Sequence, residues 1–278
     1  MKICMLLDNR RVNNTFHVEH GLSIYIEFQD KKIVFDTGKS GLFIENAAKM
    51  GINIADIDMA IISHAHKDHS GGLYNFLALN NKAPVYMSAN ATRDYYSEFL
   101  FIKKDIGVPK EVFAQFNNRI VFINESVAMN DNICLLSAIT QDYPLANSNK
   151  NLMTVIDGKV IADTFDHELV LVVNDNGKLV IFTGCCHNGI DNIIQRVREH
   201  FPGTAIELLI GGFHLMDFPR NIYQESSEHI KQLGERLISY EIDKVYTCHC
   251  TGNRAFGLLK EVMGDKLDYF YTGMELQL

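Results

Sequence analysis

The stretch Ser63–Gly72 reads SHAHKDHSGG and directly follows the apolar run Met59–Ile62. It places three histidines and one aspartate within six positions, and the Ser70-Gly71-Gly72 end supplies backbone freedom and a helix cap. Imidazole and carboxylate groups are ligands of zinc and of other first-row divalent ions. Four such groups crowded at the end of a buried strand therefore predict a metal site rather than a solvated loop.

The spacing within this loop predicts which ligands bind a first ion and which bind a second. In an extended segment His64 and His66 project to the same side and can share one ion. Asp68 and His69 lie beyond a bend, which displaces them enough to hold a second ion. Asp68 is then both a ligand and a candidate proton acceptor in catalysis. We expect one or two divalent ions, with Zn²⁺ favoured and Mn²⁺ or Fe²⁺ as alternatives.

The bulk properties narrow the class of protein. A chain of 278 residues with 47% hydrophobic residues is typical of one domain, expected over residues 1–278. Its formal charge of −8, with both signs interspersed, argues against nucleic-acid binding. No stretch approaches the ~18 consecutive apolar residues of a membrane span. The six cysteines are too few and too unevenly spaced for a disulfide framework. We expect a cytoplasmic protein, not bound to membrane, that acts on a small molecule and is compatible with a homodimer.

The order of the predicted elements indicates the fold class. Strand-like runs at Lys2–Leu7 and Leu22–Phe28 precede helical spacing, and a second set of strands over residues 119–182 precedes helices such as Ile190–His200. Asp157-Gly158 and Asn176-Gly177 are typical of tight hairpin turns. Two blocks, each with strands first and helices after, predict a layered α/β sandwich with two sheets inside and helices outside. The aromatic segment Asp94–Phe101 is predicted as a partly buried helix.

The H-x-H-x-D-H loop after a buried strand resembles the signature of the metallo-β-lactamase superfamily. Two further motifs of that family recur in order, Asp36 in IVFDTG and His249 in TCHCTG. The resemblance implies a four-layer αββα fold with a mono- or dinuclear metal site at one edge of the sandwich. It also implies that Asp36 orients the metal loop and that His249 binds the second metal.

Four more segments are similar to one branch of this superfamily, named for 7,8-dihydropterin-6-yl-methyl-4-(β-D-ribofuranosyl)aminobenzene 5′-phosphate synthase. They are EHGLS at Glu19–Ser23, GCCHNG at Gly184–Gly189, GGFHL at Gly211–Leu215 and HCTG at His249–Gly252. The resemblance implies a transferase that joins a dihydropterin diphosphate to an aminobenzene ribofuranosyl phosphate. It makes a phosphorylated or pterin-like substrate a candidate, and Phe213 or the Tyr95–Phe101 segment a candidate pterin slot.

The chain departs from the family at Cys185, where many superfamily hydrolases have an aspartate that bridges two metals. His187 is the favoured replacement, because with His64 and His66 it completes three protein ligands and leaves a position open for water. The thiolate of Cys185 is the alternative ligand. His167 is a reserve candidate for the third ligand.

Three further residues are candidates for functional roles. His214, at the end of an apolar strand, is predicted to be a general acid or base, or to contact a substrate phosphate. Glu19 and His20 are predicted to bind substrate or to orient the metal ligands.

The ligand set predicts a metal-dependent hydrolase in which a metal-bound water or hydroxide attacks an ester, phosphoester or lactone-like centre. The transferase is the second hypothesis, because its metal would need the same ligands. A metal-binding sensor without turnover is the third.

Overall fold

The computed structural model describes residues 1–100, 102–216 and 225–278. It divides into two compact units, each taken by itself below. Unit 1 comprises Met1–Asn124, Leu152–Leu169 and Tyr271–Leu278, and unit 2 comprises Glu125–Asn151 and Val170–Phe270. The expectation of one domain over residues 1–278 stays a prediction. None of the helices in the described ranges is long and apolar enough to cross a bilayer.

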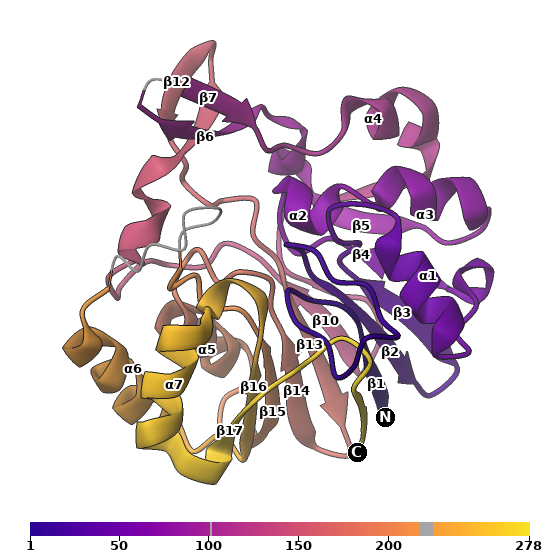
Figure 1. Cartoon of the computed structure of the whole chain (residues 1–278). Coiled ribbons are helices and arrows are strands. Elements are labelled where there is room, and N and C mark those ends of the chain that lie inside the picture. Colours follow the sequence, from indigo (N-terminus) through magenta and orange to yellow (C-terminus); the bar gives the residue numbers. More distant parts are fainter. Residues whose placement is uncertain (101, 217–224) are drawn as a thin grey trace. The chain divides into compact units, whose positions relative to one another are not determined.

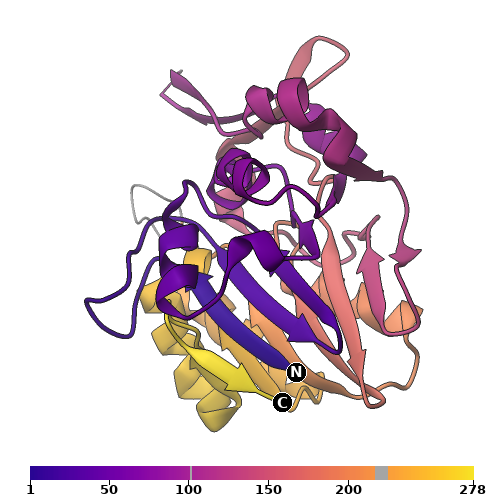
Figure 2. The same ribbon diagram turned by 90° about the vertical axis from the view of Figure 1, so that its right-hand side faces the viewer.

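The main sheet of unit 1 has seven strands in the order β18-β1-β2-β3-β4-β5-β8. Their bounds are Glu275–Gln277 (β18), Lys2–Leu7 (β1), Ser23–Phe28 (β2), Lys31–Phe35 (β3), Met59–Ile61 (β4), Val85–Ser88 (β5) and Ile120–Ile123 (β8). The first three pairs are antiparallel, whereas β3, β4, β5 and β8 run parallel. Figure 2 shows the early strands of this sheet side by side.

Helices cover one face of this sheet (Figure 1). Unit 1 contains α1 (Leu42–Lys49), α2 (Lys67–Ser70), α3 (Leu73–Leu79), α4 (Lys110–Phe116), and the 3-10 turns η1 (Ile54–Asp56), η2 (Ala89–Thr92) and η3 (Asn117–Arg119). Alternate strand residues such as Leu6 and Val34 cluster with Phe43 of α1 and Phe76 of α3. The two-residue period of a strand produces this apolar face.

A second, four-stranded sheet of unit 1 corrects one sequence prediction. It has the order β12-β11-β6-β7, with β6 at Tyr95–Phe99, β7 at Ile102–Asp105, β11 at Leu152–Ile156 and β12 at Lys159–Ala162. The helix predicted over Asp94–Phe101 is wrong, because the segment pairs with β7 on one side and β11 on the other. Aromatic residues favour such a pleated, half-buried position. Phe101 lies outside the described residues.

Unit 2 is built on a seven-stranded sheet in the order β17-β16-β15-β14-β13-β10-β9. The bounds are Val127–Ala128 (β9), Ile133–Leu136 (β10), Val170–Asp175 (β13), Lys178–Phe182 (β14), Ile206–Gly211 (β15), Lys244–Thr247 (β16) and Leu267–Tyr269 (β17). Strands β14 to β17 are parallel neighbours. Their carboxyl ends therefore share one edge, where loops in such sheets carry functional groups.

The described residues of unit 2 include three α-helices, of which the first has the bounds predicted from the sequence. They are α5 (Ile190–His200), α6 (Ser227–Ser239) and α7 (Asn253–Met263), with 3-10 turns η4 (Asn147–Asn151), η5 (His249–Thr251) and η6 (Gly264–Lys266). The Oγ atom of Ser226 accepts a hydrogen bond from the N–H of His229 and caps α6. The predicted turns at Asp157-Gly158 in unit 1 and Asn176-Gly177 in unit 2 are confirmed, with positive φ at all four residues.

Candidate metal centre

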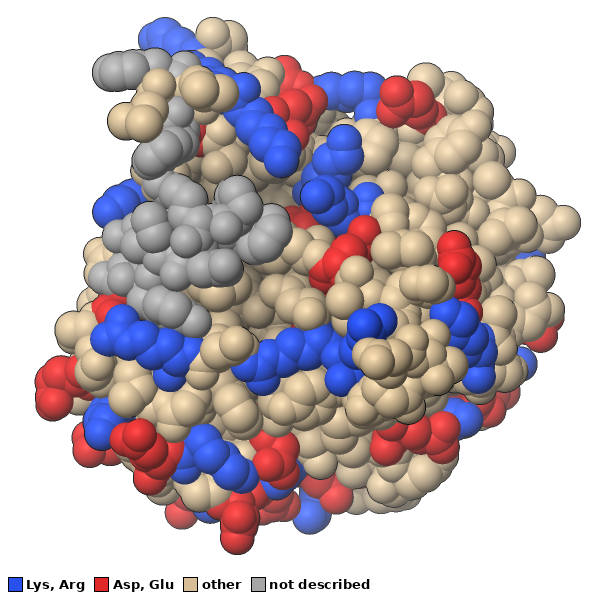
Figure 3. All heavy atoms as spheres, viewed as in Figure 1, with Lys and Arg blue, Asp and Glu red and all other residues tan. Residues whose placement is uncertain are grey.

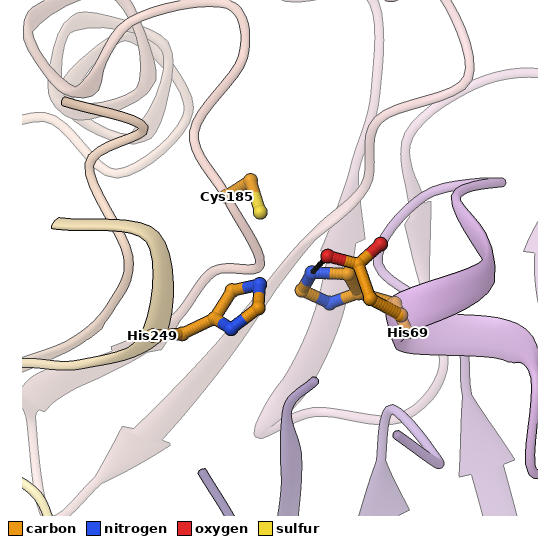
Figure 4. A group of neighbouring side chains, drawn as sticks. His69, Cys185 and His249 are labelled. Atoms are coloured by element: carbon orange, nitrogen blue, oxygen red, sulfur yellow. Dashed lines mark ion pairs between the residues drawn. The ribbon is translucent and has the colours of Figure 1, made fainter. Parts of the chain in front are cut away.

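The loop after β4 in unit 1 brings its predicted ligands together. The rings of His64 and His66 lie 4.7 Å apart between centroids, and those of His64 and His69 lie 4.1 Å apart. All three rings are buried, whereas Asp68 is partly exposed. Figure 4 shows His69 extending from α2. The loop therefore carries four side chains of metal-ligand type within six consecutive residues.

Asp36, which follows β3, holds this loop. Its carboxylate accepts hydrogen bonds from the N–H and the Oγ of Ser63, both at 2.7 Å, and contacts Nδ1 of His69 at 2.6 Å. Asp36 itself has a φ of 60°, in the left-handed region that non-glycine residues rarely adopt. Because Nδ1 of His69 is engaged by the carboxylate, Nε2 is the nitrogen directed to an ion.

The imidazole of His64 is held in the form that binds metal. Its Nδ1 lies 2.9 Å from the Oγ of Ser63. Burial, with smaller effects from the charges of His69 and His66, lowers its pKa well below the ordinary value of 6.5. His64 is therefore neutral at pH 7, as a metal ligand must be.

Asp163, which the sequence analysis missed, joins His66 to His167 within unit 1. Its Oδ2 lies 3.3 Å from Nε2 of His66 and 3.2 Å from Nε2 of His167. The N–H of Ala65 donates to Nδ1 of His167 at 3.0 Å, so His167 carries its proton on Nε2 and donates it to Asp163. Both ring nitrogens of the reserve ligand candidate His167 are thus used within the protein. In the sequence, only the four-residue separation of Asp163 and His167 hinted at a contact between them.

The charge of Asp163 is strongly favoured in this position. Burial acts to raise its pKa, but the hydrogen bonds from His167 and His66 outweigh that effect and hold the pKa far below its ordinary value. The carboxylate accepts from Nε2 of His66, which makes Nδ1 the ligand nitrogen of that ring. Ligand atoms of these three residues also lie within 4.8 Å of one another.

The EHGLS motif contacts the metal loop through His20 and the Lys39–Ser40 segment through Glu19. Oε1 of Glu19 accepts from the N–H groups of Lys39 and Ser40 at 3.0 and 2.9 Å, and Oε2 accepts from the Oγ of Ser40. Nε2 of His20 lies 3.2 Å from Oδ2 of Asp68. Glu19 thus contacts backbone, and His20 orients the carboxylate of Asp68; a role of either in binding substrate stays a prediction.

In unit 2, the loops at the carboxyl edge of the sheet carry the remaining candidates. Cys185 and His187 follow β14, His214 follows β15, and His249 follows β16. Ligand atoms of Cys185 and His249 lie within 4.8 Å of each other. Figure 4 shows these two side chains as neighbours. The rings of His187 and His214 are 4.2 Å apart between centroids.

His187 is held much as the histidines of unit 1 are. Its Nδ1 lies 2.9 Å from Oδ1 of Asn149, and the amide nitrogen of Asn149 donates to the carbonyl of His187 at 2.8 Å. Asn149 is the second residue that the sequence analysis missed, because it lies in a polar segment without a recognisable motif. His187, like His64 and His69, has its Nδ1 oriented by a protein group, which leaves Nε2 to bind a ligand.

The same edge stores backbone strain and a perturbed thiol. Cys186, His214 and His249 have φ values of 56°, 46° and 49°, and such outliers cluster at functional sites. Burial acts to raise the pKa of the Cys250 thiol, but its contacts with Cys185 and His214 and the charge of the nearby imidazoles hold that pKa well below its ordinary value. Cys250 is the third residue that the sequence analysis did not select.

The residues present fit a divalent first-row ion. The donors are imidazoles and a carboxylate in unit 1, and imidazoles and a thiol in unit 2, which is the donor chemistry of zinc and its neighbours. The oriented Nδ1 atoms of His64, His69 and His187 are the arrangement that metal-binding histidines show.

The chain belongs to the metallo-β-lactamase superfamily, whose family model matches residues 18–249. The predicted mixed α/β fold of the metallo-β-lactamase type is thereby confirmed. The resemblance to the synthase branch is confirmed as well. The 7,8-dihydropterin-6-methyl-4-(β-D-ribofuranosyl)-aminobenzene-5′-phosphate synthase of Methanocaldococcus jannaschii is 27% identical over 273 residues, which cover 94% of this chain and 90% of that protein.

Solved structures agree. The crystal structure of Tm1679, named as a metal-dependent hydrolase of the β-lactamase superfamily, has a TM-score of 0.84 and 31% sequence identity, covering 100% of this chain and 99% of that one. A diphosphatase from the PhnP family has a TM-score of 0.55 and 12% identity, covering 100% of this chain and 97% of that one. The second likeness concerns the fold alone.

Proposed function

We propose that this protein is a metal-dependent hydrolase of small esters, phosphoesters or lactones, and that zinc is its metal. The observation that carries the proposal is the loop of His64, His66, Asp68 and His69, in which protein groups orient the imidazoles for metal binding. The likeness to a metal-dependent hydrolase at 31% identity supports it.

The ion would be held by the loop in unit 1, and the ligands predicted in unit 2, His187 and His249, stay predictions. When bound, a divalent ion lowers the pKa of water to about 7 and stabilises negative charge that develops on a substrate oxygen. The chain's own residues supply the rest. We assign to Asp68, whose carboxylate His20 contacts at 3.2 Å, the role of accepting a proton from the attacking water. Asp36 holds the first residue of the loop, Ser63, through two hydrogen bonds, which preorganises the ligands for catalysis.

The proposed partner is a small molecule and not a nucleic acid. On the face drawn in Figure 3, Lys and Arg side chains are interspersed with Asp and Glu. A nucleic-acid site would instead favour a basic stripe. We place the protein in the cytoplasm, because none of its six cysteines forms a disulfide although all six lie within the described ranges.

The test begins with protein stripped of metal by a chelator and dialysed. We expect hydrolysis of nitrophenyl esters, nitrophenyl phosphodiesters or lactones to disappear and to return when Zn²⁺, Mn²⁺ or Fe²⁺ is added back. A His64→Ala/His66→Ala variant should stay inactive after reloading, whereas His17→Ala, which changes a half-exposed histidine of the same unit, should recover. Activity that is indifferent to metal on every substrate class contradicts the proposal.

A synthase-like transferase is the second candidate, favoured by the 27% identity over 94% of the chain. It needs the same ligands, so the ligands do not separate the two functions. Mixing a dihydropterin diphosphate with an aminobenzene ribofuranosyl phosphate decides the question. A coupled product with stoichiometric release of diphosphate supports the transferase, and release of phosphate from either substrate alone supports the hydrolase.

A further inference from the structure

Three side chains of unit 2 form a cluster with a different donor chemistry from the metal loop. Cys185 follows β14, His214 follows β15, and Cys250 lies in η5 after β16. The two sulfur atoms and a ring nitrogen of His214 all lie within 4.8 Å of one another, and both cysteines are buried. Two thiols and an imidazole are the donors of a Cys₂His zinc site.

His214 supplies the second observation. Both of its ring nitrogens are shielded from solvent and have no hydrogen-bond partner within the described part of the chain. Its backbone is nevertheless fixed, because its N–H donates to the sulfur of Cys250 at 3.2 Å and its carbonyl accepts from the Oγ of Ser148. Buried polar groups are almost always satisfied, so an unsatisfied imidazole held in a strained conformation needs an explanation. A bound cation supplies one.

The third observation is the space made for the sulfur of Cys250. A Cβ atom on Gly212 would lie 2.5 Å from that sulfur, so a larger residue there would displace it. The N–H of Gly212 donates to the carbonyl of Gly184 at 2.8 Å, which ties the loop after β15 to the loop after β14. The loops after β14 and β15 are thus joined by a backbone hydrogen bond, and the N–H of His214 joins the second of them to the sulfur of Cys250.

Charge selects the kind of ion. Two thiolates and one neutral imidazole balance the charge of a divalent cation. The complex is therefore neutral, and burying it costs little desolvation free energy. Calcium and magnesium prefer oxygen ligands, which this cluster lacks. We propose that Cys185, His214 and Cys250 bind a zinc-class divalent ion within unit 2. With three protein ligands, the site has a position for an exogenous fourth ligand, as catalytic rather than structural zinc sites do.

Cobalt titration of the metal-free full chain tests this site. Bound Co²⁺ should give a thiolate-to-metal charge-transfer band in the near ultraviolet with about one equivalent. The band should be lost or at least halved in Cys250→Ser, and its tetrahedral visible bands should be weakened in His214→Ala. It should persist in His64→Ala/His66→Ala, which tests the metal loop separately, and in Cys134→Ser, a control at another buried cysteine of unit 2.

Two results would overturn the proposal. One is a charge-transfer band that is unchanged in Cys250→Ser. The other is a band that disappears in His64→Ala/His66→Ala, because Cys185 would then serve the ion of the loop. Circular dichroism checks that each variant folds. Cadmium NMR of the unmodified chain depends on no variant, since its chemical shift reports the number of bound sulfurs, and a spectrum without a two-sulfur resonance also contradicts the site.

Discussion

Replacing Asp163 by Asn tests how unit 1 orients its metal ligands. The carboxylate accepts hydrogen bonds from Nε2 of His66 and of His167, and asparagine keeps the shape but removes the charge. Both rings donate to Oδ2, and the N–H of Phe165 donates to Oδ1 at 2.9 Å, so in either orientation the NH₂ group of the asparagine amide faces at least one N–H donor. His66 then either faces that NH₂ group or donates to a neutral amide oxygen, and both outcomes weaken the contact that makes Nδ1 its ligand nitrogen.

The magnitude follows from the loss of the carboxylate charge that both rings contact. Removing a carboxylate that orients a metal-binding histidine typically weakens metal affinity by about 10- to 100-fold, which is about 1.4 to 2.8 kcal/mol. The metal-free protein should also lose about 1 to 3 kcal/mol of stability, because a buried donor is left unsatisfied. Competition with a zinc chelator measures the first effect, and urea unfolding of the metal-free protein measures the second.

Asp166→Asn is the matched control, since this exposed aspartate three residues away pairs with Arg93. An exposed pair contributes about 0 to 1 kcal/mol, so its zinc affinity should equal that of the unchanged protein. The reasoning is refuted if a folded Asp163→Asn protein binds zinc as tightly as this control.

Three further predictions concern other parts of the site. In a Cys250→Ser background, which removes the proposed thiolate site, His187→Ala should lose about one further metal equivalent by elemental analysis and Cys185→Ala should lose none; the reverse result would make the cysteine the ligand of the loop ion. Burial lowers the pKa values of His64 and His66 below 6.5, so unfolding takes up protons below that pH. Stability of the metal-free protein should therefore fall as pH drops from 6.5, by up to about 1.4 kcal/mol per unit for each ring, and a flat profile in urea titrations from pH 7 to 5 would contradict this. Gly21→Ala brings a Cβ atom within 2.8 Å of a backbone oxygen of the metal loop, which should cost about 1 to 3 kcal/mol; an unchanged melting temperature would count against the close packing described.

Local sequence patterns predicted much of the fold. The helix over Ile190–His200 has the predicted bounds, and both predicted hairpin turns form, because apolar spacing and Asn-Gly or Asp-Gly pairs act within a few residues. The helix prediction for Asp94–Phe101 was wrong, because this segment pairs as a strand with β11, whose residues lie far along the chain. Local spacing does not encode such a partner.

The candidate site likewise divides into residues that a local motif identifies and residues that only long-range contacts identify. The loop of His64 to His69 is recognisable because its ligands are adjacent in sequence, and Asp36 follows from the family resemblance. Asp163 lies 97 residues from His66 and Cys250 lies 36 residues from His214, so only the folded chain reveals these contacts. Cys250 was also obscured by its position in a C-H-C run without a second cysteine pair.

The central claim is that the SHAHKDHSGG loop binds a metal ion. Elemental analysis of the full chain as purified tests it most directly, on the unchanged protein, a His64→Ala/His69→Ala variant, and the control His17→Ala. The account predicts at least one equivalent of zinc or a neighbouring first-row metal in the unchanged protein and the control, and a loss of about one equivalent in the loop variant. A folded loop variant that keeps the full metal content would contradict it.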